Sequence, residues 1–194
     1  MRRYEALQEI MKAITDEPVV CNLGHPAQEL FTVRDRPQNF YMLGSMGLAS
    51  SIAHGLALCH PGKVLVIDGD ASVTMNLGGF ATIGHTQPKN LVQIIIDNGA
   101  NGSTGFQPSF TSENLHLDQI ARAAGIKRVI VVTEQKDIVP AVKSALAANE
   151  GPTVLLIRTE VGMPDNIGVI PLGGIEIRDR FVKSLGKPSA AKAT

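Results

Sequence analysis

Short apolar runs alternate along this chain with longer segments in which apolar residues recur every three or four positions. The runs have the length of β-strands, and most are rich in Val and Ile. Runs this apolar are typical of parallel strands that helices cover on both faces. The pattern therefore predicts an α/β fold of three layers, with a mostly parallel sheet of about six strands between helices. The predicted strands are residues 18–23, 39–42, 63–67, 91–97, 127–132 and 153–158.

Segments with helical periodicity separate these strands. The segment 46–59 consists almost wholly of small and apolar residues, so we expect a helix that packs against neighbours on several sides and can approach a second subunit. Two longer stretches, 99–114 and 160–174, contain no predicted element, and long Gly-rich loops of this kind are often functional. The predicted helices are residues 3–15, 26–32, 46–59, 72–85, 115–124 and 134–149.

The length of 194 residues, of which 44% are hydrophobic, is enough for one domain with an apolar core. We expect this domain to span residues 1–186, and we expect residues 187–194, which include no large apolar residue, to form a disordered tail. A formal net charge of +0 without a basic run predicts no nucleic-acid partner. The apolar runs are too short to cross a bilayer and no secretory signal is visible, so we expect a cytoplasmic protein without a membrane partner.

Several common kinds of site are excluded by the sequence. Cys21 and Cys59 are too far apart to suggest a disulfide framework or a metal cluster, and we expect both to be buried, reduced thiols. No Gly-x-Gly-x-x-Gly follows a strand, no P-loop is present, and the glycines of residues 102–105 have the wrong spacing for a nucleophile elbow. The five histidines are scattered and lack the spacing of zinc ligands.

Polar residues follow two buried strands of the predicted sheet. The strand 63–67 is followed by Asp68-Gly-Asp-Ala-Ser72, and the strand 91–97 ends in Asp97-Asn-Gly-Ala100. In a parallel sheet both turns lie at the carboxyl edge, where ligands bind. A carboxylate, an amide oxygen and free amides at a helix start suit Mg²⁺ together with a diphosphate. The alternative interpretation is two Asx-rich turns that only cap helices.

The two turns have the spacing of a cofactor signature. Gly69-Asp70-Ala71, followed after 25 residues by Asp97-Asn98, resembles the Gly-Asp-Gly and Asn-Asn signature of enzymes that use thiamin diphosphate. The segment Gly44-Ser-Met-Gly47 is similar to a segment of the same enzymes. Over about residues 1–183, the chain resembles the thiamin diphosphate-dependent decarboxylases that act on sulfopyruvate and phosphonopyruvate. The further segments that carry this resemblance are 40–52, 75–78, 81–83 and 98–105.

The resemblance implies the ligands of a magnesium ion and of the cofactor. Asp70, the Asn98 side chain and the Ala100 carbonyl would bind Mg²⁺ together with two diphosphate oxygens, and Ala71 and Ser72 would hold the diphosphate. The cofactor-binding candidates are Gly24, His25, Gly44, Ser45, Met46, Gly69, Asp70, Ala71, Ser72, Asn98, Ala100, Asn101 and Gly102.

Two of these candidates are also predicted to be catalytic. By the resemblance, Met46 supports the bent form of the cofactor, and the Gly44 carbonyl accepts a hydrogen bond from the cofactor's amino group. Gly24 and His25 fall where related enzymes have a loop that touches the diphosphate or the substrate. The alternatives are that Met46 is a core residue and that His25 belongs to a simple turn or helix start.

The chain departs from the signature at four positions. Ala71 replaces the second Gly, which would matter if that position required a positive φ angle. Asp97 replaces the first Asn, Asn101 stands where the family often has Tyr, and Phe106 stands where the family has a polar residue. The cofactor is therefore better supported than the substrate.

The resemblance also implies a reaction and a partner. The family decarboxylates 2-keto acids with a glutamate that lies on a separate pyrimidine-binding domain, and this chain is too short to hold that domain. We therefore expect an α subunit that supplies the domain and its glutamate, in an α₂β₂ or larger assembly. The expected substrate is an anionic 2-keto acid, with 3-sulfopyruvate first.

The substrate prediction leaves alternatives open. The loop 99–114 contains no Lys or Arg, so its neutral side chains would have to bind the substrate anion, or the partner chain would supply basic residues. Phosphonopyruvate or another 2-keto acid could be the substrate, and a carboligase would share the cofactor. A non-catalytic ligand-binding or scaffold subunit is the alternative from another class. The neutral candidates are Asn101, Ser103, Thr104 and Gln107.

Overall fold

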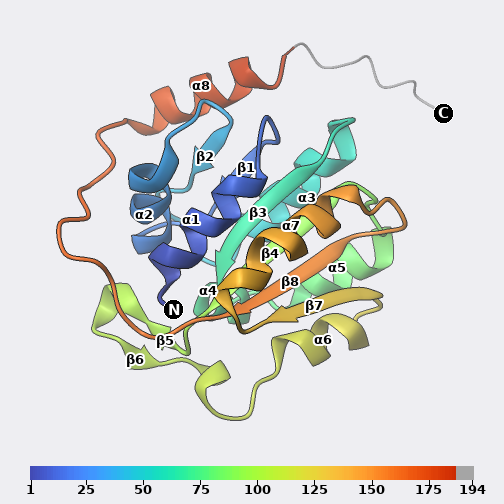
Figure 1. Cartoon of the computed structure of the whole chain (residues 1–194). Helices are drawn as coiled ribbons and strands as arrows, with labels where there is room; N and C mark the ends of the chain where they lie inside the picture. Colours follow the sequence, from blue (N-terminus) through green and yellow to red (C-terminus); the bar gives the residue numbers. More distant parts are fainter. Residues whose placement is uncertain (187–194) are drawn as a thin grey trace.

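A computed structural model describes residues 1–186 and contains a six-stranded sheet in the order β2-β1-β3-β4-β8-β7 (Figure 1). All five neighbouring pairs are parallel, which confirms the predicted α/β fold. Five of the six strands fall within the predicted runs, and β3 extends two residues beyond the predicted run 63–67. The strands are β1 (Val19–Cys21), β2 (Asn39–Tyr41), β3 (Val64–Gly69), β4 (Leu91–Asp97), β7 (Arg128–Val132) and β8 (Thr153–Arg158).

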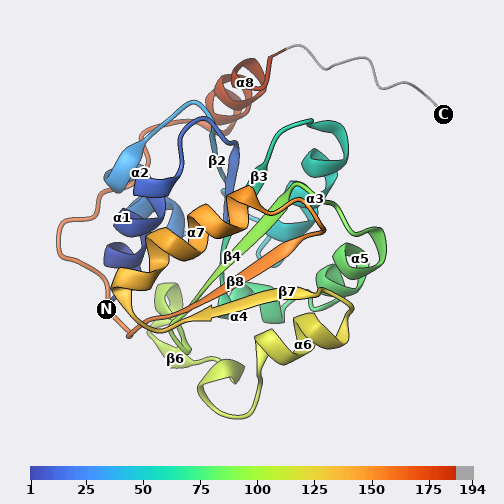
Figure 2. The same cartoon turned by 45° about the vertical axis from the view of Figure 1, so that its right-hand side comes forward.

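Helices cover both faces of the sheet (Figures 1 and 2). Successive side chains of a strand point to opposite faces, so Leu65 and Ile67 of β3 join one apolar cluster and Val64 and Val66 join the other. The first cluster includes residues of α1 (Arg3–Ala13), α2 (His25–Arg34) and α7 (Ile138–Ala147). The second includes residues of α3 (Ala49–Cys59), α5 (Gly78–Thr86) and α6 (Leu117–Ala123).

The predicted helix 72–85 is wrong in one respect, because the structure divides it into α4 (Asp70–Thr74) and α5. The break follows from local chemistry. Asn76 donates a side-chain hydrogen bond to the Gly47 carbonyl at 3.1 Å, and the Gly78-Gly79 pair that follows has low helix propensity. The division leaves a short helix directly behind β3, at the carboxyl edge of the sheet.

One helix was not predicted. α8 (Gly174–Ser184) buries Ile177 and Phe181, and the Phe181 ring lies 5.4 Å from the Phe40 ring of β2. Its outer face is charged, and Arg180 pairs with Asp35 at 2.7 Å. α8 therefore packs at the β2 edge of the sheet (Figure 1).

The loop 99–114 has short elements that the sequence did not predict. β5 (Ala100–Asn101) pairs with β6 (Gln107–Pro108) in an antiparallel hairpin. One 3-10 turn, Gly102–Thr104, lies between the two strands of the hairpin, and a second, Phe110–Ser112, follows it. These turns carry the loop back over the carboxyl ends of β3 and β4.

Three remaining expectations concern the cysteines, the tail and the membrane. Cys21 is buried as expected, but Cys59 is exposed at the end of α3, so the prediction for Cys59 is wrong. The tail predicted at residues 187–194 lies outside the described residues. None of the helices in the described part of the chain has both the length and the apolar composition that crossing a membrane requires.

Candidate active site

A cavity of about 120 Å³ lies at the carboxyl ends of β1, β3 and β4. Three connections form it: the loop after β1, the start of α4 after β3, and the turn after β4. Eleven of the thirteen cofactor-binding candidates line this cavity, and only Gly44 and Ser45 lie outside its lining. The structure thus brings together residues that are up to 100 positions apart in the sequence, from Arg3 to Ser103.

The turn after β3 answers the question that Ala71 raised. Gly69 is in extended conformation, with φ −109° and ψ 156°, and α4 begins at Asp70. Ala71 is a helical residue and is absent from the positive-φ positions of the described chain. Alanine in place of the usual glycine therefore causes no backbone strain at this turn.

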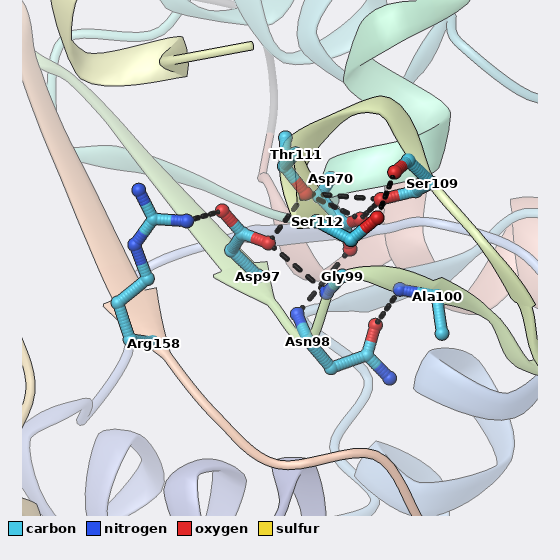
Figure 3. Close-up of polar contacts among 9 residues, drawn as sticks. All are labelled: Asp70, Asp97, Asn98, Gly99, Ala100, Ser109, Thr111, Ser112 and Arg158. Atoms are coloured by element: carbon cyan, nitrogen blue, oxygen red, sulfur yellow. Dashed lines mark hydrogen bonds and ion pairs between the residues drawn. The ribbon is translucent and has the colours of Figure 1, made fainter. Parts of the chain in front are cut away.

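Asp70 is the one carboxylate in the lining of the cavity, and it is buried. It accepts hydrogen bonds from the Ser109 hydroxyl and from the Asn98 backbone amide at 3.4 Å, and the Thr111 hydroxyl oxygen lies 3.0 Å from it (Figure 3). Burial raises the pKa of Asp70, as does the charge of nearby Asp97. A cation bound to Asp70 would oppose both effects.

Asn98 follows β4 and faces the same cavity. Its side-chain oxygen accepts a hydrogen bond from the Ala100 amide at 3.2 Å (Figure 3). Its side-chain nitrogen is buried and has no hydrogen-bond partner within residues 1–186. A buried amide that is only half satisfied is typical of a group that a ligand completes.

These groups fit Mg²⁺, which prefers oxygen ligands and keeps several positions for water or substrate phosphates. The protein offers one carboxylate, one amide oxygen and the Ala100 carbonyl. Within residues 1–186 no group of three or more His, Cys, Asp or Glu side chains could hold a metal ion. A cation at Asp70 would thus need oxygens from its ligand, as a diphosphate supplies.

Asp68 lies at the end of β3 and is buried beside this site. Burial raises its pKa to about 6, although hydrogen bonds from Ser72 and from the Gly69 amide act in the opposite direction. One of its oxygens has no partner in the described chain. Asp68 does not line the cavity, so it supports the turn rather than a ligand.

Met46 is held over the start of α4 by a strained turn. Ser45 has a φ of 61° and Gly47 a φ of 91°, and the Gly47 amide donates to the Ser72 hydroxyl at 3.0 Å. A side chain at Gly47 would also meet Met75 at 3.1 Å. Met46 lines the cavity, remains 37% exposed and belongs to neither apolar cluster. Its position therefore argues against the core interpretation. α3 begins at Ala49, three residues later than predicted.

His25 is the first residue of α2, and it lies on the other side of the cavity. Its Nδ1 atom is buried without a hydrogen-bond partner in the described chain. A Cβ atom at Gly102 would come within 3.0 Å of that nitrogen, so only glycine fits there without a shift. Burial and the charge of Arg3 lower the pKa of His25, which favours the neutral ring.

The sequence did not predict five of the lining residues, of which two are polar or charged: Arg3 and Asn22. Arg3 lies on α1 and pairs with Glu29 of α2. Leu7 and Ile10, four and seven positions later, are fully buried, so the helical period already placed Arg3 on the buried face of α1. Asn22 is the polar residue directly after β1. Its place at the carboxyl end of an apolar strand is the same feature that identified the turns after β3 and β4.

Comparison with protein families agrees with this geometry. Residues 22–157, which include every cavity residue except Arg3, match the model of the thiamine pyrophosphate enzyme, C-terminal TPP binding domain. The chain belongs to this family. Its signature turns and its Met46 segment both fall inside the matched region.

Individual relatives are similar over almost the whole chain. The chain is 46% identical over 187 residues to the sulfopyruvate decarboxylase subunit beta of Methanococcus maripaludis. The alignment covers 96% of this chain and 99% of the relative. It is 40% identical to the protein of the same name from Methanocaldococcus jannaschii, over 95% and 97% of the two chains. It is also 38% identical to phosphonopyruvate decarboxylase of Streptomyces viridochromogenes, over 99% of this chain but 48% of the relative.

A solved structure shows the same fold. The thiamine diphosphate-dependent 4-hydroxybenzoylformate decarboxylase of Rhodococcus jostii RHA1 matches with a TM-score of 0.70 and 21% identity. The match covers 84% of this chain and 33% of that one. The predicted α/β architecture is thus one that thiamine diphosphate enzymes use.

Proposed function

We propose that this chain is the diphosphate-binding β subunit of a decarboxylase that uses thiamin diphosphate and Mg²⁺ to convert 3-sulfopyruvate to sulfoacetaldehyde and carbon dioxide. The observation that carries the proposal is the cavity in which Asp70, Asn98 and the start of α4 meet. Near full-length similarity to sulfopyruvate decarboxylase β subunits supports the choice of substrate. We also propose that the domain that binds the cofactor spans residues 1–186.

The residues of the cavity have separate roles in this proposal. When bound, thiamin diphosphate would supply an electron sink for the electron pair that remains when the carboxylate of the 2-keto acid leaves as carbon dioxide. Asp70, the Asn98 side chain and the Ala100 carbonyl bind Mg²⁺, and the Ala71 and Ser72 amides bind diphosphate oxygens. The whole set therefore anchors the cofactor through its charged end.

The other candidates orient the cofactor. Met46 supports its bent form from the turn over α4, and the Gly44 carbonyl accepts a hydrogen bond from its amino group. Neutral His25, with Gly24, faces the diphosphate or the substrate from the opposite side of the cavity. Asn101 and Gly102 continue the lining after Ala100 and help to exclude water.

A partner subunit completes the site. This chain covers 48% of phosphonopyruvate decarboxylase, so the remaining half of that relative has no counterpart here. An α subunit would supply that half, with the pyrimidine-binding domain and the activating glutamate, in an α₂β₂ or larger assembly. Beside the cavity, Leu43, Leu48, Ile52 and Met75 are 40–66% exposed and suit a protein interface.

The test is reconstitution from purified subunits. This chain, the α subunit, thiamin diphosphate and Mg²⁺ are mixed with 3-sulfopyruvate, and carbon dioxide release is measured. Phosphonopyruvate and pyruvate serve as competing substrates, because the first is the substrate named for a 38% identical relative. Preference for another 2-keto acid would change the substrate assignment. Absence of Mg²⁺-dependent cofactor binding in calorimetry would instead favour a non-catalytic subunit.

A further inference from the structure

Asp97 places a second carboxylate beside the proposed metal site. It is the last residue of β4, directly before Asn98, and it is buried. The signature that this chain otherwise resembles has a neutral asparagine at this position. The substitution therefore adds a negative charge in a buried place, and such a charge needs a partner.

Arg158 is that partner. It ends β8, the strand next to β4, and the parallel register places it directly opposite Asp97. The Arg158 guanidinium donates to one carboxylate oxygen of Asp97 (Figure 3). The Arg158 side chain is one-third exposed, whereas that of Asp97 is buried. If Asp97 is replaced, water still solvates the Arg158 guanidinium. If Arg158 is replaced, the buried Asp97 carboxylate has neither water nor a counter-charge.

The other oxygen of Asp97 holds the turn that carries the proposed metal ligands. It accepts a hydrogen bond from the Gly99 amide at 3.1 Å and from the Thr111 hydroxyl at 2.7 Å (Figure 3). The Gly99 amide lies between Asn98 and Ala100, so this bond fixes the orientation of both neighbours. Gly99 has a φ of 67°, a conformation that the bond to Asp97 helps to hold.

Thr111 connects Asp97 to Asp70. Its hydroxyl oxygen lies 2.7 Å from Asp97, 3.0 Å from Asp70 and 2.9 Å from the Ser109 hydroxyl. A hydroxyl has one hydrogen to donate, so Thr111 cannot donate to both carboxylates at once. Because the Ser109 hydroxyl already donates to the same oxygen of Asp70, the shorter contact of Thr111 assigns its hydrogen to Asp97.

We propose that Arg158 is a positioning residue for the metal site: through Asp97 it holds the Asn98–Ala100 turn and Thr111, so that Asp70, Asn98 and the Ala100 carbonyl can bind one cation. Arg158 also cancels the charge that Asp97 adds. The pair therefore has no net charge, like the asparagine that the signature has at this position. This inference rests on the proposed function for the identity of the cation. Arg158 itself touches neither cation nor cofactor.

The experiment measures Mg²⁺ affinity by calorimetry in the presence of thiamin diphosphate, on the full chain in complex with the α subunit. Arg158→Gln should weaken Mg²⁺ binding about 10-fold, the lower end of the effect of losing a direct partner of a metal ligand, because Asp97 lies between Arg158 and the ligands. Asp97→Asn/Arg158→Gln should return to within a few-fold of the wild type, because the asparagine needs no counter-charge. Asp97→Asn alone should have a similarly small effect, because Arg158 is then solvated.

Arg128→Gln is the matched control. Arg128 is the first residue of β7, so it lies at the amino ends of the strands, away from the carboxyl edge that forms the cavity. Its guanidinium bonds Ser144, and its loss should leave Mg²⁺ affinity unchanged. If Arg158→Gln does not fold, Arg158→Lys takes its place. The double variant Asp97→Asn/Arg158→Gln should then bind Mg²⁺ more tightly than Arg158→Lys does. The inference would be overturned if the single Arg158 variants bound Mg²⁺ as tightly as the wild type or more tightly. It would also be overturned if the double variant bound Mg²⁺ no more tightly than the single variants. If the wild-type complex itself shows no Mg²⁺-dependent binding, the proposed function fails instead.

Discussion

Arg3 of α1 and Glu29 of α2 form a two-pronged ion pair against the wall of the cavity. Arg3 Nε lies 2.7 Å from Glu29 Oε2, and Arg3 Nη2 lies 2.8 Å from Glu29 Oε1. Glu29 is completely buried and Arg3 is 6% exposed. The pair joins two helices that begin at the carboxyl edge of the sheet, and of its two members only Arg3 faces the cavity.

Arg3→Met should destabilise the fold by about 3–5 kcal/mol, because it leaves a buried carboxylate without a partner. Urea unfolding of the purified chain measures the loss. Arg3→Met/Glu29→Met removes both charges and should recover most of the stability. If the single variant were as stable as the wild type, the pair would have no structural role.

Asp70→Asn should abolish Mg²⁺-dependent binding of thiamin diphosphate, because it removes the only charged protein ligand while it keeps the shape of the side chain. Calorimetry on the reconstituted complex gives the affinity. Asp16→Asn is the control, since Asp16 is exposed and does not line the cavity. Retained affinity in the Asp70 variant would show that the metal ion binds elsewhere.

Met46→Ala should lower kcat about 10- to 100-fold and change cofactor affinity only a few-fold, since the diphosphate anchor remains while the reactive geometry loosens. Steady-state kinetics and cofactor titration separate the two effects. Leu58→Ala is the control, because Leu58 of α3 is 61% exposed and does not line the cavity. Equal activity of both variants would contradict the proposed role of Met46.

This chain alone should not decarboxylate 3-sulfopyruvate, even with saturating thiamin diphosphate and Mg²⁺. The expected glutamate belongs to the α subunit, and Asp70 is the only carboxylate among the residues that line the cavity. Carbon dioxide release should begin when the α subunit is added. Robust turnover by the purified chain alone would exclude the two-subunit proposal.

The sheet could be predicted because its signal is local. The strand β4, for example, is a seven-residue segment rich in Ile and Val, and its length and β-branched residues favour a strand over a helix. The two signature turns could be placed together for the same reason, since the carboxyl ends of parallel strands share one edge. The sequence therefore located Asp70 and Asn98 correctly relative to each other.

The remaining differences depend on contacts that periodicity does not contain. The break between α4 and α5 follows from the bond between Asn76 and Gly47, which are 29 positions apart. α8 was missed because only Ile177 and Phe181 are buried among its 11 residues, a weak apolar signal. The pairing of Asp97 with Arg158 needs the order of strands β4 and β8, and spacing along the chain does not reveal that order.

The central position of β4 also has a consequence for amide hydrogen exchange. β4 lies between β3 and β8 and contributes side chains to both apolar clusters, so its amides should exchange only when the whole domain unfolds. Residues 103–108, which follow closely, are exposed and should exchange far sooner. The turn at Asn98 thus joins the most protected strand to one of the least protected loops. We therefore expect the loop amides to exchange without any opening of the strand that carries Asp97.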